Sequence, residues 1–481
     1  MTVIFDRPFM KEFYRFRKAE SLIHRFKELQ NQEIYFASQE ELNDPMEGYR
    51  DLFWQGDAIV WKNFISNYIK SVEQIFKLYS VVNESKKIDE TDIVDTFKLT
   101  AVFTPFQNTI IETISEKVFK IPFISKLPEA LSKRINPIRR SELLSYLQFI
   151  HPFVINGVSQ TYYENGLISF PFLRKDLSEF ENIIEKSGSL PELLNKIELD
   201  NKNNSLESFL TVIGIYSQTT LLTARKNYER KLNNKNSLFL LYEFPIKYLD
   251  KLTAEIYPPW YSASFLSDCK NSAIWGHYGD NHKGICLIFN ATVDGNNEMS
   301  LNLETEYGYS SGPIIGMRPH KFRKIKYENA PTEIDFFRSI GRLRKFELDK
   351  LWYKDSNGNR SVCGQHLVDN EEEWREKYWS NFFDSISIKL KEWEYENEYR
   401  LVINGDFIDY TDKNRRKLKY SFNDLSGIIF GIRTPSIDKI EIMKIVKQKC
   451  NETSRSDFDF FQAYYSIATK QIETFKMPSL E

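Results

Sequence analysis

The feature that most constrains the fold is a change of hydrophobic period along the chain. Residues 53–230 carry apolar side chains three and four apart, as in "AIVWKNFISNYIKSVEQIFKLYSVV", and this spacing is typical of helices that bury one face. Both flanks instead carry short alternating or apolar runs typical of strands, including "FYRFR", "EIYFAS", "KGICLIF", "YRLVING" and "LSGIIFGI". Because strands from both ends of a chain can complete one sheet, we predict an α+β fold with a mixed or antiparallel sheet and a large helical insertion.

The predicted organisation has three parts. Residues 1–52 and 236–450 form an α+β domain of catalytic type, and residues 53–235 form the helical insertion. The segment "NSLFLLYEF" at 236–244 is predicted to be a strand that resumes the sheet, and 451–481 is predicted to be a C-terminal helical tail.

Charge and composition exclude several classes of protein. The 65 basic and 67 acidic residues leave a net charge of −2, which does not indicate a basic face for nucleic acid. The four cysteines show no CxxC spacing, so we expect reduced thiols rather than a zinc site or disulfides. No run approaches the roughly 18 apolar residues of a membrane span, and the start of the chain has no signal-peptide core. We therefore expect a cytoplasmic protein without a membrane partner, and self-association stays open.

The motif "WGHYGDNHKG" at 275–284 lies just before an apolar strand and holds two of the six histidines. His277 and His282 are five positions apart, which is not the spacing of a helical metal pair, and no third ligand is obvious, so no metal site is predicted. Lys283 and the glycine after it suggest a close approach to an anion. The alternative is a polar loop in which His277 and Tyr278 satisfy backbone groups beside a ligand.

The segment "KEWEYENEYRLVI" at 391–403 places three glutamates at alternate positions, and as a strand it would put Glu394, Glu396 and Glu398 on one face. Like charges on one face repel each other unless cations, a ligand or solvent compensate them. Facing a cleft, they could bind sugar hydroxyls and stabilise a developing positive charge; facing solvent, they would form an ordinary polar edge.

The segment "YRFR" puts Arg15 and Arg17 on an early strand. Beside a cleft these arginines would clamp a pyrophosphate, and elsewhere they would be plain surface charges. The next segment, "IYFASQEELNDPME", holds an Asn43-Asp44-Pro45 turn. Ser38 either ends a strand beside a ligand or caps the following turn, with Glu41 completing a capping box.

In this order the segments resemble the bacterial family named domain of unknown function 2971. Members open with an aromatic-basic-aromatic-Arg strand and an "Iyfss…NDPfE" segment, here "YRFR" and "IYFASQEELNDPME". A "W-x-H-Y-x-x-x-H-K-G" motif, a "W-E-Y-E-x-E-x-R" motif and a closing "i-i-F-G" follow, here "WGHYGDNHKG", "WEYENEYR" and "IIFG". The resemblance covers about the first 50 residues and 255–435. Gln39 replaces the usual proline, Met46 replaces an aromatic residue, and "WYSASFLSD" lacks the cysteine often found beside its serine.

The layout of this family is similar to that of the ADP-ribosyltransferase superfamily, which places an Arg or His on a first strand, a Ser or an aromatic residue on a second and a Glu, often as Glu-x-Glu, on a late strand. This resemblance implies NAD as the substrate, Arg17 at the diphosphate and Ser38 at the nicotinamide ribose. The catalytic residues it implies are Glu396, Glu398 and His277. The residues expected to bind NAD are Arg15, Arg17, Tyr35, Ser38, Asn43, Asp44, Tyr278, His282, Lys283 and Arg400.

The leading functional hypothesis is therefore an NAD-consuming ADP-ribosyltransferase-like effector of a phage-defence or toxin system, whose helical insertion selects a macromolecular acceptor or regulator. One alternative is a magnesium-dependent nuclease or phosphodiesterase, with Asp44, Glu47 and a late glutamate on the metal and His282 and Lys283 at the phosphate. Another is a sensor that binds a nucleotide without turnover. The leading hypothesis requires segments near 15–40, 275–284 and 394–400 to meet around one cavity.

Overall fold

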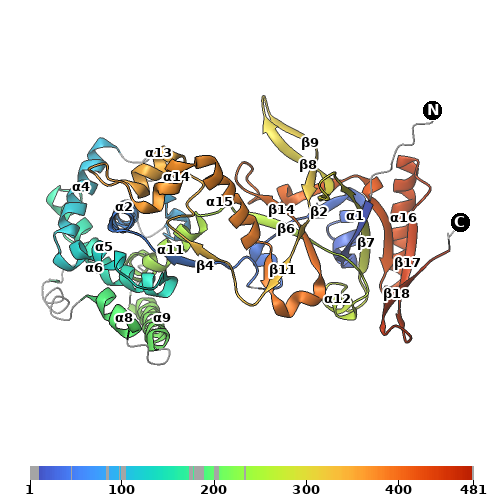
Figure 1. The fold of residues 1–481 in the computed structure, drawn as a ribbon, viewed down its shortest axis with the longest axis horizontal. Coiled ribbons are helices and arrows are strands. Elements are labelled where there is room, and N and C mark those ends of the chain that lie inside the picture. Colours follow the sequence, from blue (N-terminus) through green and yellow to red (C-terminus); the bar gives the residue numbers. More distant parts are fainter. Residues whose placement is uncertain are drawn as a thin grey trace. The chain divides into compact units, whose positions relative to one another are not determined.

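The structure is a computed structural model. It describes residues 10–44, 46–82, 86–96, 98, 104–172, 177, 189–199, 205–231 and 235–478. These residues form two compact units, and the chain passes between them more than once (Figure 1). Unit 1 takes the described residues of Met1–Tyr49, Pro258–Thr332 and Phe383–Glu481, and unit 2 takes those of Arg50–Tyr257 and Glu333–Phe382.

Unit 1 is built on one large sheet with the strand order β10-β14-β6-β1-β7-β16-β17-β18, to which β2, β3, β8, β9 and β15 are attached by further pairings. All neighbours are antiparallel except β16 and β17. The strands are β1 (Met10–Arg17), β2 (Glu33–Tyr35), β3 (Ala37–Ser38), β6 (Trp260–Leu266), β7 (Ile285–Val293), β8 (Met299–Tyr309), β9 (Pro313–Lys321), β10 (Arg323–Lys324), β14 (Glu398–Asn404), β15 (Lys417–Tyr420), β16 (Leu425–Phe430), β17 (Asp459–Ser466) and β18 (Gln471–Lys476). A separate parallel pair joins β11 (Lys326–Glu328) to β13 (Ile388–Leu390).

Strand β7 is central because it pairs with β1 on one edge and with β16 on the other. Its first five side chains are all buried, as expected of a strand covered on both faces. Leu287 and Phe289 belong to a core that includes residues of helix α16 (Ser436–Thr453). Cys286 and Ile288 belong to a second core on the other face, which includes helix α12 (Ser272–His277). The sheet of unit 1 therefore packs on both of its faces.

Unit 1 also holds short helical segments between its strands. They are η1 (Glu20–His24), α1 (Glu28–Asn31), η2 (Gln39–Glu41), η7 (Lys391–Glu396), η8 (Lys413–Arg416) and η9 (Phe422–Asp424). Two of them matter for the site described below, because η2 precedes the loop that carries Glu47 and η7 ends at Glu396.

The sheet opens beside β6. Strand β6 pairs with β14 along its whole length, but with β1 only through Tyr14 and Leu266. On the same edge, β3 pairs only with Ser262 and Tyr261. Among the described strands, the edge of β6 between these contacts has no strand partner, and the end of β1 at Arg15–Arg17 pairs with β7 alone. The cavity described below opens at this gap in the sheet.

Unit 2 is mostly helical. Its longer helices are α2 (Ala58–Val81), α4 (Pro105–Phe119), α5 (Pro122–Ser132), α6 (Arg140–Glu164), α8 (Leu190–Leu199), α9 (Ser205–Lys231), α11 (Phe244–Ala254) and α15 (Glu371–Ser385), the last of which ends in unit 1. Its shorter helical segments are η3 (Glu90–Asp92), α10 (Lys235–Leu238), η4 (Phe239–Glu243), α13 (Lys345–Leu348), η5 (Asp349–Tyr353), η6 (Val362–Gly364) and α14 (Gln365–Asp369). A small sheet has the order β12-β4-β5, with β12 (Glu333–Asp335), β4 (Asp51–Trp54) and β5 (Ile138–Arg139).

The packing of unit 2 follows from amphipathic helices. Helix α2 is capped at its N-terminus by Asp57, whose carboxylate accepts hydrogen bonds from the backbone N–H groups of Ile59 and Val60. Its buried face contacts α6, and Tyr68 of α2 hydrogen-bonds His151 of α6 at 2.8 Å. Burial lowers the pKa of His151 to about 4, so the imidazole is neutral at pH 7. His151 is therefore a satisfied core residue.

The predicted class is confirmed: the protein is α+β with a large antiparallel sheet and a helical block in its first half. The helical unit is larger than expected, because it runs from Arg50 to Tyr257 and also takes in Glu333–Phe382. No helix in the described part of the chain is long and apolar enough to cross a bilayer. The four cysteines are free thiols.

Three local predictions are wrong. The segment 236–244 is helical rather than a strand, because Leu240 and Phe244, four positions apart, both face the core, and a short apolar run does not distinguish the two periods. The predicted C-terminal helical tail is instead the β17–β18 hairpin, which follows the end of α16 at Thr453 and extends the sheet. Residues 391–396 form the 3-10 helix η7, so the strand β14 begins only at Glu398.

Candidate active site

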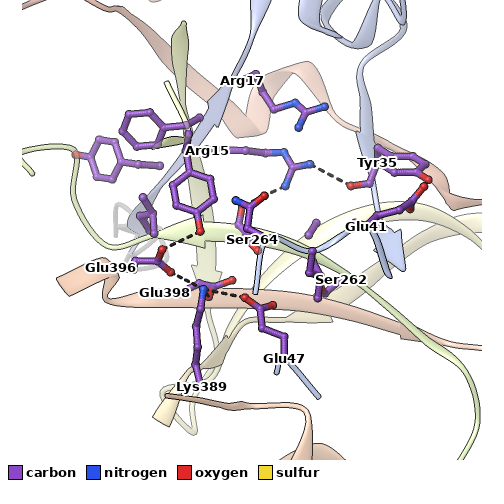
Figure 2. Close-up of a pocket in the computed structure, with 18 residues that line it drawn as sticks. Arg15, Arg17, Tyr35, Glu41, Glu47, Ser262, Ser264, Lys389, Glu396 and Glu398 are labelled. Carbon is purple, nitrogen blue, oxygen red and sulfur yellow. Dashed lines mark hydrogen bonds and ion pairs between the residues drawn. The ribbon is translucent and has the colours of Figure 1, made fainter. Parts of the chain in front are cut away.

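A cavity of about 210 Å³ opens into unit 1 at the gap beside β6 (Figure 2). All its lining residues belong to this unit. They are Tyr14, Arg15, Phe16, Arg17, Tyr35, Ala37, Glu41, Leu42, Asn43, Glu47, Ser262, Ala263, Ser264, Leu266, Tyr278, Lys389, Glu396 and Glu398. The early segment, the 275–284 loop and the Glu396–Glu398 segment, far apart in sequence, therefore meet around one cavity.

Arg15 is a buried cation that donates hydrogen bonds to two backbone carbonyl groups. Its Nη1 donates to the carbonyl of Ser264 and its Nη2 to that of Tyr35, each at 3.1 Å, so the guanidinium bridges the gap in the sheet (Figure 2). The side chain is 6% exposed and lies 5.2 Å from the ring of Phe265. Among the described residues it forms no ion pair. Burial, and then Arg17, lowers the pKa of Arg15 to about 9, which leaves it charged at pH 7 and able to bind an anion.

Arg17 is in a different situation, although it also lines the cavity. Its Nε donates to Glu28 at 2.7 Å and its Nη2 donates to the other oxygen of the same carboxylate. This bidentate pair neutralises Arg17 and fixes its fork geometry. Of the two arginines of "YRFR", Arg15 is therefore the one with charge left for a ligand.

The opposite side of the cavity is a buried cluster of charges centred on Lys389. Its Nζ lies 2.8 Å from Glu47, 2.8 Å from Glu396 and 3.5 Å from Glu398 (Figure 2). Burial alone would lower the pKa of Lys389, but Glu398, Glu47 and Glu396 raise it above its ordinary value. Lys389 is therefore the common counter-ion of the three carboxylates.

Arg400 completes the cluster by pairing with two of its carboxylates. Its Nε and Nη2 donate to the two oxygens of Glu398 at 2.7 and 2.8 Å, and Nη2 also donates to Glu47 at 2.8 Å. Burial would raise the pKa of Glu398, but Arg400 and Lys389 outweigh it and hold the pKa below its ordinary value. Glu398 is therefore ionised and held in one orientation.

Glu396 differs from Glu398 in both partners and acidity. Its Oε1 accepts a 2.8 Å hydrogen bond from the hydroxyl of Tyr278, and its Oε2 accepts one from Lys389. Burial raises the pKa of Glu396, and Lys389 offsets this only in part. With three carboxylates against two cations, the cluster carries one surplus negative charge, so Glu396 is the member best suited to take up a proton.

Ser262 adds an unsatisfied polar group to the cavity wall. Its hydroxyl is buried and has no hydrogen-bond partner among the described residues. Ser264, two positions later on β6, also lines the cavity and hydrogen-bonds Glu398. A buried hydroxyl without a partner is unfavourable, so a ligand that hydrogen-bonds Ser262 would gain from it.

The structure brings together only part of the predicted site. Of the predicted residues, Arg15, Arg17, Tyr35, Asn43, Tyr278, Glu396 and Glu398 line the cavity. Ser38, Asp44, His277, His282 and Lys283 do not line it, and Arg400 does not line it either but hydrogen-bonds two residues that do, Glu398 and Glu47.

Ser38 and Asp44 have structural roles instead. Ser38 is the N-cap of η2 and forms the alternative capping box with Glu41, whose carboxylate accepts the Ser38 N–H at 3.0 Å. Asp44 accepts the backbone N–H of Met46 at 2.9 Å within the turn, and its other oxygen is buried and has no partner in the part of the chain that the structure describes. Pro45 of this turn lies outside the described residues.

The loop after α12 is shaped for tight packing rather than for anion binding. Gly284 gives its N–H to the carbonyl of Gly279 at 2.7 Å, so that N–H is not free for a phosphate. His277 and Lys283 are exposed and are not among the residues that line the cavity, so the structure does not bring them together with the other predicted site residues. Of this loop, Tyr278 alone lines the cavity.

Backbone conformation explains this arrangement. Asp280, Asn281 and His282 adopt successive left-handed conformations with φ of 49°, 53° and 67°, and Asp and Asn tolerate that region better than most residues. The turn brings the carbonyl of His282 to within 2.4 Å of where a Cβ on Gly431 would lie. The polar residues of "HYGDNHKG" thus build a turn whose main contribution to the site is the position of Tyr278.

Sequence reasoning missed Lys389, Ser262 and Ser264 as site residues, and assigned Glu47 only to a metal hypothesis. No sequence pattern indicated that Lys389 belongs to the site, because nothing in "SIKLKEW" distinguishes it from a surface lysine. The "S-A-S" alternation on a strand could have indicated two serines on one face. Glu394, by contrast, is exposed, because η7 breaks the alternation that would have aligned it with Glu396.

The fold and the site define an α+β protein whose sheet holds a charged cavity at a gap between two strands. Residues 274–401 match the family model described as protein of unknown function (DUF2971), which confirms the resemblance over those residues. That family description carries no activity. No curated protein and no solved structure shows significant similarity to the chain.

Proposed function

We propose that unit 1 cleaves the bond between nicotinamide and ribose in NAD and transfers ADP-ribose, as ADP-ribosyltransferases do. One observation carries the proposal: a single cavity holds the buried Arg15, which pairs with no carboxylate among the residues that the structure describes, opposite the buried pair Glu396 and Glu398. A cation for a diphosphate and an oriented carboxylate for a ribose are the two groups that this reaction needs.

Glu398 and Glu396 would have different roles in this reaction. Loss of nicotinamide leaves an oxocarbenium-like ribose, and an ionised Glu398 beside it stabilises the developing positive charge. Glu396, with its raised pKa, accepts the proton of the attacking acceptor group. The bond from ribose to nicotinamide breaks, the bond from ribose to the acceptor forms, and nicotinamide leaves with the bonding electron pair. Ser262 would hydrogen-bond a ribose hydroxyl.

The size of the cavity supports partial enclosure of NAD. At about 210 Å³ it is smaller than the roughly 300–1,000 Å³ of pockets that enclose whole drug-sized ligands. It would hold the nicotinamide–ribose end, with the diphosphate at Arg15 and the adenosine outside. The protein would act in the cytoplasm as an effector of a defence or toxin system, with unit 2 selecting the acceptor or regulator.

The test is incubation with NAD labelled in the adenylate part, measuring free nicotinamide and label transferred to cell protein. We expect Glu398→Gln to abolish both signals and Glu396→Gln to reduce transfer most. Glu394→Gln is the matched control, because Glu394 is a neighbouring but exposed carboxylate. Bound NAD with no release of nicotinamide by the wild type would refute the proposal and leave the sensor hypothesis.

The nuclease hypothesis is less well supported by the residues. Its phosphate ligands His282 and Lys283 do not line the cavity, and the three carboxylates that could meet there already surround Lys389. Among the described residues, no group of three or more His, Cys, Asp or Glu could hold a metal ion. Activity on NAD that survives EDTA separates the two hypotheses, because magnesium-dependent cleavage would stop.

A further inference from the structure

Helix α9 of unit 2 buries one side against its own unit. It packs against α6 and α8, and α8 lies beside it (Figure 1). Ala224 is 8% exposed, and Gly214 and Leu221 are half-buried. These three residues are separated by seven and three positions, so they share one helical face, which is the inner one. The opposite side of α9 faces away from α6 and α8.

Four large apolar side chains occupy this outer side of α9. Val212, Ile215, Tyr216 and Leu222 are 64%, 59%, 74% and 64% exposed, and their spacing of three, four and seven positions places them in one stripe. Residues 208–224 also contain no Asp, Glu, Lys or Arg. The solvent face of a surface helix is normally charged, so an uncharged face with this much apolar surface indicates a binding partner.

The spacing of the stripe indicates which partner fits it. Val212, Ile215, Thr219 and Leu222 are three, four and three positions apart, which is the spacing of the core positions in a coiled coil. This spacing is symmetric about position 217, so it is the same when the helix is read in the opposite direction. An identical antiparallel helix therefore places Val212 opposite the partner's Leu222 and Ile215 opposite the partner's Thr219.

We propose that two copies of this chain pair through α9, antiparallel and related by a two-fold axis near position 217. A two-fold axis requires a surface that is complementary to itself, as this stripe is. The first cations beyond the stripe, Arg225 and Lys226, would lie opposite the uncharged positions 209 and 208 of the partner, so the pairing brings no like charges together. A membrane surface fits the stripe less well, because the Lys and Arg residues typical of membrane-surface helices are absent from 208–224.

The area of the stripe sets the strength of this pairing. From their exposed fractions, the four apolar side chains present roughly 500 Å² in each copy. Pairing would then bury about 1,000 Å² in total, which is the lower limit for a specific interface. The dimer should therefore be weak, with a Kd of about 1–100 μM. This pairing depends neither on the candidate active site nor on NAD chemistry.

The test is sedimentation velocity of the whole chain at about 1 to 100 μM, over which the wild type should pass from one copy to two. Ile215→Glu and Thr219→Lys each put a charge between the helices and should weaken pairing by about tenfold or more. An equimolar mixture of the two variants should restore the dimer, because antiparallel pairing sets the new carboxylate opposite the new ammonium group. Parallel pairing would give no such restoration, because each substituted position would then face its own counterpart.

Ile437→Glu is the matched control, because Ile437 is an isoleucine of α16 in unit 1 that is 71% exposed, and its replacement should leave the dimer unchanged. Circular dichroism melting of each variant verifies folding, which these exposed positions should not affect. A wild type that stays a single copy up to about 100 μM would overturn the proposal. So would an Ile215→Glu dimer as strong as that of the wild type, or a mixture of the two variants that forms no dimer.

Discussion

Glu47 accepts a 2.8 Å hydrogen bond from Arg400, a residue 353 positions later in the chain. Both side chains are almost inaccessible, at 3% and 1%. The other oxygen of Glu47 pairs with Lys389 at 2.8 Å. Because buried charges are tolerated only when they are paired, this cluster ties the N-terminal segment to the late strand β14 and makes the cavity wall part of the stability of unit 1.

Replacing Lys389 should therefore strongly destabilise the protein. Lys389→Met leaves Glu47 and Glu396 buried without their shared cation, which we expect to lower the free energy of unfolding by about 3–5 kcal/mol. Urea denaturation measures this change. Lys391→Met is the control, because Lys391 is exposed and should change stability by less than about 0.5 kcal/mol. Similar losses for the two variants would contradict a central role for Lys389.

Replacing Ser262 should separate binding from stability. Ser262→Ala removes a buried hydroxyl that has no partner, so the melting temperature should stay unchanged or rise, while NAD binding should weaken. Ser264→Ala should lower the melting temperature, because it removes a hydrogen bond to Glu398. Thermal melting and NAD titration of both variants check this. A clear loss of stability in Ser262→Ala would mean that its hydroxyl is satisfied within the protein.

Replacing Arg15 should reveal whether it binds a diphosphate. Arg15→Lys keeps the positive charge but loses the fork that reaches both carbonyls, so ADP affinity should fall by about tenfold. Lys283→Gln should leave ADP affinity unchanged, because Lys283 is exposed outside the cavity. Calorimetric titration with ADP compares the two variants. A larger effect at Lys283 would restore the loop as the anion site.

Replacing Tyr278 should shift a pH profile. The hydroxyl of Tyr278 stabilises the charged form of Glu396, so Tyr278→Phe should raise the pKa of Glu396 further. Transfer of ADP-ribose, which needs ionised Glu396 to accept the proton, should then fall off at a higher pH as the solution is acidified, so that the acidic limb of its pH profile moves up by about half to one pH unit. Tyr14→Phe is the control, because the hydroxyl of Tyr14 donates to Glu12 instead. An unmoved limb in Tyr278→Phe would exclude Glu396 as the titrating group.

Two glycines should respond oppositely to an added methyl group. A Cβ on Gly431 would lie 2.4 Å from the carbonyl oxygen of His282, so Gly431→Ala should destabilise the protein by about 1–3 kcal/mol. A Cβ on Gly276, in helix α12, meets nothing within 4 Å, so Gly276→Ala should be neutral or stabilise the protein by up to about 1 kcal/mol. Chemical denaturation of both variants tests how tightly the loop after α12 is packed.

The sequence predicted the fold class because hydrophobic period is a local signal. It also indicated which segments supply the cavity, since the Arg15 strand, Tyr278 and the Glu396–Glu398 segment all contribute to its wall. The sequence-based prediction was wrong at residues 391–396, where the same alternating pattern fits both a strand and a short helix. Alternation suggested one continuous strand through Glu394, whereas the left-handed Asn397 separates a 3-10 helix from the strand.

Sequence alone determined the mixture of helix and strand and the identity of the charged segments, because each depends on neighbours within a few residues. Only the tertiary structure decided which charges are buried together. Arg15 and Arg17 look alike in "YRFR", yet within the described ranges Arg17 pairs with a carboxylate and Arg15 does not. Lys389 looks like a surface lysine, yet three glutamates surround it. Burial and pairing of a charge depend on residues hundreds of positions away, and no local pattern records them.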